Sequence, residues 1–228
     1  MPKKKGKSRT PLQRDAILTA AIRLADAQGI EALSMRRLGR EVGVEAMSLY
    51  NHVANKDDVL DGIVDLIVGE IEVPSLREDW KAAMRRRGLS AHEVLMRHPW
   101  ATKLMVSRVN VGPNMLRYVN ATIGSLREAG FSWAMADHAW NVIDSFVYGF
   151  TLQRLNFPFD ADEYANVAAS YLPSISAEEF PYLRGMTREV AEGRHDGLQD
   201  FAFGLDLVLD GLARLRSTEP AEAKPVDV

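Results

Sequence analysis

The stretch at residues 40–56, REVGVEAMSLYNHVANK, constrains the fold more than any other part of the chain. Helical periodicity precedes it, but Gly43-Val44 interrupts that periodicity, because glycine readily adopts the left-handed conformation that ends a helix. Only a few helix-compatible residues then remain before Asn55, which is a helix-capping residue. The pattern predicts two short helices joined by a glycine turn, with small Gly39 where they cross. That is the layout of a helix-turn-helix.

Cap and stop signals predict further helices, whereas strand signals hardly appear. Thr10, Pro11 and Gln13 form a capping box that starts a helix over residues 11–28. We therefore expect an all-α fold. The other predicted helices cover residues 34–42, 45–50 and 55–73, with Ser34 and Asn55 as caps and Pro74 as the stop.

The C-terminal part contains two long amphipathic segments, residues 133–153 and 197–216. Gly204 and Gly211 in the second segment could let a partner helix approach closely in a dimer, the alternative being a helix packed only within its own chain. Residues 158–193 between them are richer in Pro, Ser, Ala and acidic residues, so we expect a mobile loop and one short helix there. One face of the second segment carries Leu198, Phe201, Leu205, Val208, Leu209 and Leu212.

Composition excludes several classes of protein. Cysteine is absent, which excludes a disulfide framework and a thiolate metal cluster. No apolar segment has the pattern of an export signal or the length of a membrane span, so we expect a soluble, cytoplasmic protein without a membrane partner. Residues 1–60 contain eleven Lys and Arg against seven Asp and Glu, although the whole chain carries a net charge of −3. The basic end is a candidate surface for a polyanion, or simply a solubilising tail.

A helix that enters a DNA groove cannot present only long, solvated charges on its outer face. Leu49 and Val53 can face inward onto Val44 and Leu38, which leaves small or polar residues facing outward. The alternative is a plain helical hairpin in which Tyr50 and His52 are half-buried packing residues. The outward residues are Ala46, Met47 and Ser48 on the helix, and Tyr50, Asn51, His52 and Lys56 at its rim as phosphate donors.

Residues 29–67, GIEALSMRRLGREVGVEAMSLYNHVANKDDVLDGIVDLI, closely resemble the DNA-binding domain of the tetracycline-repressor (TetR) family of bacterial transcription regulators. The segments EDWKAAMRRR, LMRHPWATKLM and FAFGLDLVLDGLARL can be aligned with the C-terminal domain of the tetracycline-repressor branch. The resemblance implies an all-α homodimer that binds a palindromic operator, represses transcription and is released by a small-molecule inducer. It also implies base or phosphate contacts from Ser34 and Arg36, and Arg36 is the best base reader because a guanidinium can bind guanine bidentately. Ala46 and Asn51 depart from the family's amide and tryptophan, so we expect a different operator.

The resemblance also implies a division of the chain into domains. We expect an N-terminal three-helix DNA-binding domain followed by a larger helical domain for ligand binding and dimerisation. The expected parts are a flexible basic arm at 1–9, the helix-turn-helix domain at 10–56, a connecting helix at 57–73, the ligand-binding and dimerisation domain at 74–217 and a flexible tail at 218–228.

The tetracycline repressors hold a magnesium chelate with a histidine and a carboxylate, but Met105 and Gln153 fall at those two positions. Neither a thioether nor a neutral amide suits magnesium, so we expect no metal and no cofactor. An apolar cavity for a lipophilic or aromatic inducer is expected instead, with Arg87 available to an anion. The alternative is that these residues are ordinary core and solvated surface. The candidate ligand-binding residues are Arg87, Met105, Ile123, Trp140, Phe146 and Gln153.

Two other functions compete with a repressor. A metal-dependent enzyme could be centred on His195 and Asp196, but no other histidines have the spacing of a metal site, and no phosphate loop or nucleophile elbow is present. We therefore expect no enzyme. A ligand sensor that acts through a protein partner, without DNA, is the other alternative.

Overall fold

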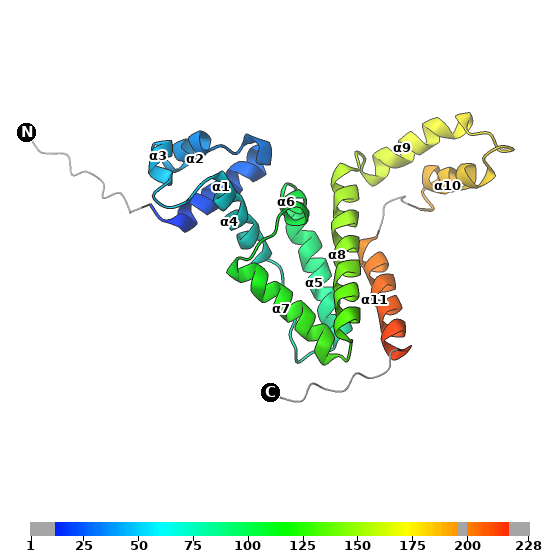
Figure 1. Ribbon diagram of the computed structural model, residues 1–228. Helices are drawn as coiled ribbons and strands as arrows, with labels where there is room; N and C mark the ends of the chain where they lie inside the picture. The colour runs from blue at the N-terminus through cyan, green and yellow to red at the C-terminus, as the bar shows by residue number, and fades with distance from the viewer. Residues whose placement is uncertain (1–11, 196–199, 219–228) are drawn as a thin grey trace, which may run out of the picture.

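A computed structural model describes residues 12–195 and 200–218 of the chain. These residues form eleven α-helices, two short 3-10 turns and no strand, which confirms the expected all-α fold. Helices α1 to α4 lie at one end, α5 to α8 and α11 form the main body, and α9 and α10 extend beyond the end of α8 (Figure 1). The helices are α1 (Arg14–Gln28), α2 (Met35–Val42), α3 (Ala46–Leu49), α4 (Lys56–Val68), α5 (Trp80–Arg97), α6 (Ala101–Ser107), α7 (Pro113–Glu128), α8 (Trp133–Asn156), α9 (Ala161–Tyr171), α10 (Pro181–Ala191) and α11 (Phe201–Thr218).

The local cap signals fix the helices of the N-terminal end. The Ser34 hydroxyl oxygen accepts a hydrogen bond from the Arg37 backbone N–H, and the Asn55 side chain accepts one from the Asp58 N–H. Gly43 ends α2 in the left-handed conformation, with φ at 72°. These three predicted caps are therefore correct.

Two predicted helix ends were wrong or lie beyond the described residues. Helix α1 begins at Arg14 after Gln13, whose side chain makes no capping bond, and the predicted Thr10 cap and the basic arm lie outside the described residues. Helix α4 ends at Val68 rather than at residue 73. The chain turns after Gly69, and Ile71 is then buried in the core, so tertiary packing ends this helix before the predicted proline stop.

The crossing of α2 and α3 depends on the absence of a side chain at Gly39. A Cβ atom at this position would lie 2.8 Å from the Val44 carbonyl oxygen and 3.1 Å from the Ala46 nitrogen. Both are backbone atoms that cannot rotate away, so only glycine allows the two helices to approach this closely. The predicted role of Gly39 is confirmed.

Helix α11 packs along α5 and α8, and its predicted apolar face is buried within its own chain. Leu205 contacts the position of Gly88 on α5, and the Phe201 ring stacks on the His92 ring with 4.2 Å between centroids. A Cβ at Gly204 would lie 2.6 Å from the Phe146 ring, so Gly204 serves packing within the chain rather than the approach of a partner. Gly211 has open space around it. Of the predicted face, Phe201, Leu205, Leu209 and Leu212 are buried, Val208 is half-buried, and Leu198 lies outside the described residues.

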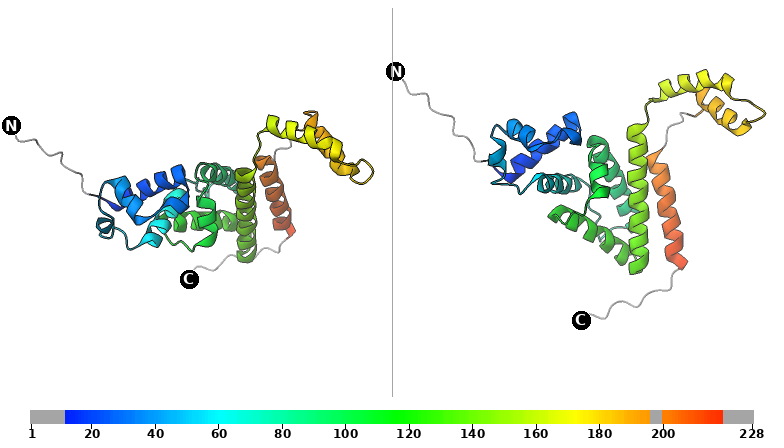
Figure 2. Two further views of the ribbon diagram at one scale, coloured as in Figure 1. Left: turned by 90° about the horizontal axis from the view of Figure 1, so that it is seen from above. Right: turned by 45° about the horizontal axis from the view of Figure 1, so that its top comes forward.

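Residues 158–193 contain two helices, where a loop and one short helix were expected. Asp160 and Glu163 form a reciprocal capping box at the start of α9, and Pro181 occupies the first turn of α10. The two helices pack on each other, and Arg184 donates a hydrogen bond of 2.7 Å to the Leu172 carbonyl between them. Figure 2 shows this pair projecting from the body in both further views. None of the helices in the described ranges is long and apolar enough to cross a membrane.

We expect Gly39→Ala to destabilise the protein by about 1 to 3 kcal/mol, the usual effect of forcing extra atoms into a packed contact. Operator binding should weaken as α2 and α3 move apart. Gly185→Ala in α10 is the control, because nothing lies within 4 Å of the added Cβ. Thermal unfolding of both variants checks the prediction, and an equal effect in both would contradict it.

Candidate functional site

The outer face of α3 is open to solvent, and its inner face is buried. Met47 is 75% exposed and Tyr50 45% exposed, whereas Leu49 and Val53 are almost fully buried. The predicted orientation of this short helix is therefore confirmed. Among the other predicted contact residues, Asn51 and Lys56 are exposed, and Ala46, Ser48 and His52 are half-buried.

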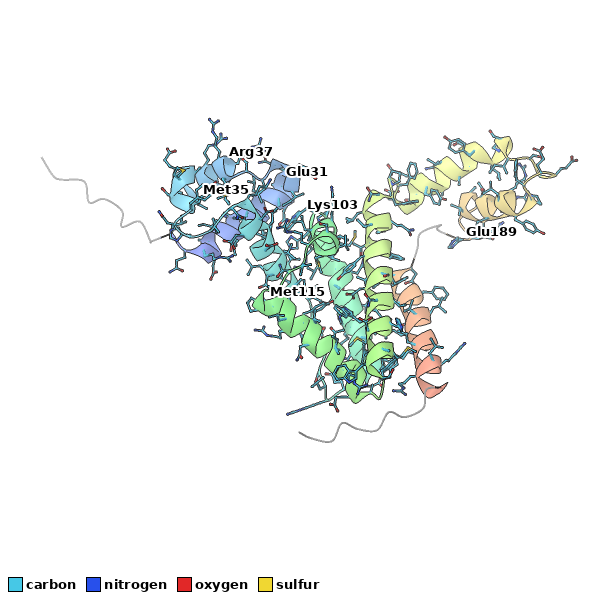
Figure 3. The ribbon with its side chains drawn as sticks, in the orientation of Figure 1. Glu31, Met35, Arg37, Lys103, Met115 and Glu189 are labelled. Atoms are coloured by element: carbon cyan, nitrogen blue, oxygen red, sulfur yellow. The ribbon has the colours of Figure 1, made fainter. Side chains whose placement is uncertain are left out.

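Two adjacent arginines at the start of α2 have different surroundings. Arg37, labelled in Figure 3, donates a hydrogen bond of 3.1 Å to the Gln28 side chain and so joins α2 to the end of α1. Arg36 is exposed, and within the described part of the chain it makes no hydrogen bond or ion pair. Ser34 is also exposed, and because its oxygen already accepts a bond in the cap, its hydroxyl hydrogen remains able to donate. Arg36 and Ser34 are therefore both exposed with donors that remain available, whereas Arg37 supports the domain.

Helix α4 joins this end of the molecule to the rest through a buried carboxylate. Asp65 accepts hydrogen bonds from the backbone N–H of Met115 at 2.9 Å and of Asn114 at 3.4 Å. These groups belong to the first turn of α7, whose N-cap, Gly112, has no side chain to satisfy them. Figure 3 shows Met115 where α4 and α7 meet. Asp65 thus caps α7 from a different helix.

Further polar contacts connect the same two regions. Arg108, between α6 and α7, bonds to Asp61 at 2.7 Å and to Asp57 at 3.1 Å, both on α4. Asp26 near the end of α1 accepts from the Trp100 indole at 2.6 Å and lies 2.8 Å from the His98 ring nitrogen. The chain around the ends of α5 and α6 is therefore tied directly to α1 and α4, the helices that support α2 and α3.

A buried polar cluster lies between α5, α7 and α8. Arg87 is 1% exposed, donates a hydrogen bond of 2.6 Å to Asp144, and has its guanidinium carbon 4.5 Å from the centre of the Tyr118 ring. Asp144 also accepts bonds from the Trp140 indole at 2.8 Å and the Tyr148 hydroxyl at 3.2 Å. Burial alone would lower the pKa of Arg87, but its electrostatic interactions with Tyr118 and Asp144 outweigh burial and raise it. Burial raises the pKa of Tyr118 and of Tyr148, so both phenols stay protonated at neutral pH.

The predicted ligand-binding residues do not form one group. Arg87 and Trp140 meet at Asp144, and Met105 on α6 and Ile123 on α7 are half-buried. Phe146 and exposed Gln153 instead line a hollow of about 600 Å³ between α8 and α11, with Phe150, Phe203 and His195. The Phe146 ring packs on the α11 ring of Phe201. The structure therefore places Trp140 apart from Phe146 and Gln153 on α8, and it does not bring the six candidate residues together around one hollow.

Sequence reasoning missed Asp65, Asp144, Tyr118 and Arg108. Asp65 and Asp144 each carry the sequence signal of a carboxylate inside an apolar helical run, which requires buried partners. The enzyme alternative gains no support: Asp196 lies outside the described residues, and His195 lines the α8–α11 hollow. No cluster of three or more metal-ligating side chains occurs among the described residues.

Family models match most of the chain. A model described as "Bacterial regulatory proteins, tetR family" matches residues 17–63, and one described as "Tetracyclin repressor-like, C-terminal domain" matches residues 73–216. The chain belongs to the tetR family. The resemblance seen in the sequence is thereby confirmed, and the helix-turn-helix and the α5–α8 body correspond to the family's two matched regions.

Relatives within the tetR family include regulators from actinobacteria. An HTH-type transcriptional regulator of Saccharopolyspora erythraea is 37% identical over 153 residues, covering 65% of this chain and 63% of that protein. The transcriptional repressor DrrR1 of Streptomyces coeruleorubidus is 28% identical over 225 residues, covering 94% of this chain and 82% of that protein. The structure of the TetR family protein ActR of Streptomyces coelicolor in complex with actinorhodin is 30% identical, with a TM-score of 0.77 over 91% of this chain and 99% of that chain.

We expect Arg36→Ala to relax the preference at one operator base pair and to weaken specific binding by about 1 to 3 kcal/mol. Tyr50→Phe removes only a hydroxyl that is placed for a phosphate, so it should weaken binding similarly on all sequences. Fluorescence anisotropy with operator variants and unrelated DNA checks both results. Equal, sequence-independent losses from the two variants would contradict base reading by Arg36.

Proposed function

We propose that this protein is a ligand-responsive transcriptional repressor that binds a palindromic operator as a homodimer and is released by a small lipophilic or aromatic molecule. The observation that carries the proposal is the exposed face of α3 beside unpaired Arg36, within a chain of the tetR family. Duplex operator DNA and a small-molecule inducer are the partners. We place DNA binding in residues 10–56 and ligand binding and dimerisation in residues 74–217, joined by α4.

The proposed DNA contacts divide by chemistry. Arg36 reads a base, and Met47 with its neighbours Ala46 and Ser48 faces the groove. Ser34, Tyr50, Asn51, His52 and Lys56 contact the phosphate backbone. Residues 61–228 carry a net negative charge, so the positive charge that attracts DNA is confined to the DNA-binding end. We therefore expect the affinity for DNA to fall steeply as the salt concentration rises.

The open faces of α8 and α11 support dimerisation. These two helices lie side by side in Figures 1 and 2, and both carry exposed apolar side chains. An isologous contact between two copies would bury this stripe in a four-helix bundle. The exposed apolar residues are Val142, Leu152, Phe203 and Leu207.

Ligand release requires the body to bias the position of α4. The Asp65 cap and the Arg108 ion pairs join α4 to α7 and to the loop before it. A ligand between α5, α7 and α8 would release DNA only by as much as it prefers the arrangement of α4 that does not fit the operator. ActR, whose structure contains actinorhodin, is a precedent for an aromatic ligand in a relative.

We expect Leu207→Arg to convert the dimer to a monomer and to weaken operator binding, because a charge would replace an apolar contact in the bundle. Analytical ultracentrifugation measures the association state. Leu116→Arg on α7 is the control, since Leu116 is 56% exposed and Leu207 58% exposed, but Leu116 lies away from the stripe. An unchanged dimer in Leu207→Arg, or dissociation in both variants, would contradict this interface.

We expect operator release to need no divalent metal. Met105 and Gln153 fall at the positions where the tetracycline repressors have a histidine and a carboxylate for magnesium, and neither side chain suits that ion. A panel of lipophilic aromatic compounds that includes actinorhodin is titrated against the operator complex, with and without excess EDTA. At least one compound should dissociate the complex equally in both conditions. Release that disappears with EDTA and returns with magnesium would overturn the metal-free mechanism, and release by none would count against the repressor function.

A further inference from the structure

The Arg87 cluster holds more hydrogen-bond donors than acceptors. Nη2 of Arg87 is paired with Asp144, but the buried Nε and Nη1 atoms have no hydrogen-bond partner among the described residues. Folding normally satisfies buried donors, because leaving one unpaired costs about 1 to 3 kcal/mol, more for a charged group. A fully buried guanidinium with two unused N–H groups is therefore an unusual feature of a folded core.

The carboxylate of Asp144 has no corresponding deficit. One of its oxygens accepts from Arg87, and the other accepts from Trp140 and Tyr148. Tyr118 places its ring 4.5 Å from the guanidinium carbon of Arg87, and its hydroxyl also interacts with Arg87. The ion pair thus leaves a positively charged group facing its surroundings with unused donors.

Helices α7 and α8, which both contribute to the cluster, also carry apolar side chains that are only partly buried. Tyr118, Val119 and Ile123 lie three, four and eight residues after Met115, so the four side chains share one face of α7. Trp140, also half-buried, lies one turn before Asp144 on α8. An aromatic body would be complementary to these walls, and an acceptor oxygen would be complementary to the guanidinium at their centre.

We propose that Arg87 selects an acidic aromatic ligand, whose ionised oxygen accepts from one of the two unpaired nitrogens, Nε or Nη1, while its rings contact Trp140 and the apolar face of α7. An ionised acceptor is favoured over a neutral one because its charge also attracts the buried guanidinium in the low-dielectric interior. Asp144 holds the guanidinium in place and moderates the affinity as a competing anion. This inference rests on the proposed ligand-responsive function and specifies the class of molecule.

The experiment compares two fluorescent probes with one ring system. 1-Anilinonaphthalene-8-sulfonate carries an anionic group, and N-phenyl-1-naphthylamine lacks it. Asp144→Asn keeps Arg87 and removes its counter-ion, whereas Asp144→Asn with Arg87→Met removes both charges and leaves no unpaired ion in the core. We expect the double variant to bind the sulfonate at least roughly tenfold more weakly than Asp144→Asn, the size of one lost charge-assisted hydrogen bond. Binding of the neutral probe should be the same in the two variants.

Arg86→Met is the matched control, because Arg86 directly precedes Arg87 on α5 and forms exposed ion pairs with Glu72 and Glu78. It should leave binding of both probes unchanged. Thermal unfolding confirms that each variant is folded. The inference is overturned if loss of Arg87 affects both probes equally, if the sulfonate binds the double variant as well as Asp144→Asn, or if wild-type protein does not bind the sulfonate. A neutral compound that still dissociates the operator complex would then leave the repressor function standing without this selectivity.

Discussion

The arrangement of the molecule depends on the carboxylate of Asp65, which is supplied by one helix and needed by another. Helix α7 starts at Pro113 after a glycine, so its first N–H groups have no local cap. Asp65 satisfies them from the last turn of α4, and a Cβ at Gly112 would lie only 2.2 Å from its Oδ1 atom. Asp65 can therefore approach α7 this closely only because Gly112 has no side chain. Because buried N–H groups and a buried carboxylate are both costly when unpaired, α4 and α7 cannot separate without losing both.

The N-terminal fold could be predicted from sequence because its signals are local. A cap such as Ser34 or Asn55 acts within one helical turn, and Gly43 needs only its own backbone freedom. The end of α4 was mispredicted because burial of Ile71, a tertiary effect, decides it. The α9–α10 pair was different. Its capping box and its first-turn proline are present in the sequence, but the polar composition of residues 158–193 predicts a loop.

The candidate site shows more clearly that sequence predicts local features but not tertiary contacts. The exposed residues of α3 follow from periodicity alone, because a helix of one turn has few ways to bury Leu49. The ligand-binding side could not be placed in that way. Asp144 and Phe146 are two residues apart, which rotates them by roughly 200° on a helix, so Asp144 meets Arg87 of α5 and Phe146 meets Phe201 of α11. Sequence spacing alone cannot say which neighbour each face meets, and Asp144 acquires its role only from Arg87, which is 57 residues away.

Helix α7 is the element that both proposed events must share. Tyr118 lies against Arg87, and Met115, less than one turn earlier, donates its N–H to Asp65. A helix transmits a shift over one turn almost rigidly, because its backbone bonds fix the spacing between these residues. A ligand that moves the Tyr118 ring must therefore move the N-terminus of α7 or break the Asp65 cap. At the other end of α4, Asp58 accepts from Arg14 of α1 and from the Ala54 N–H, so the start of α4 is fixed to α1 and to the loop that follows α3. Rotation of α4 between these two anchors changes the position of α3, and a dimer multiplies the change, because both recognition helices must match the operator at once.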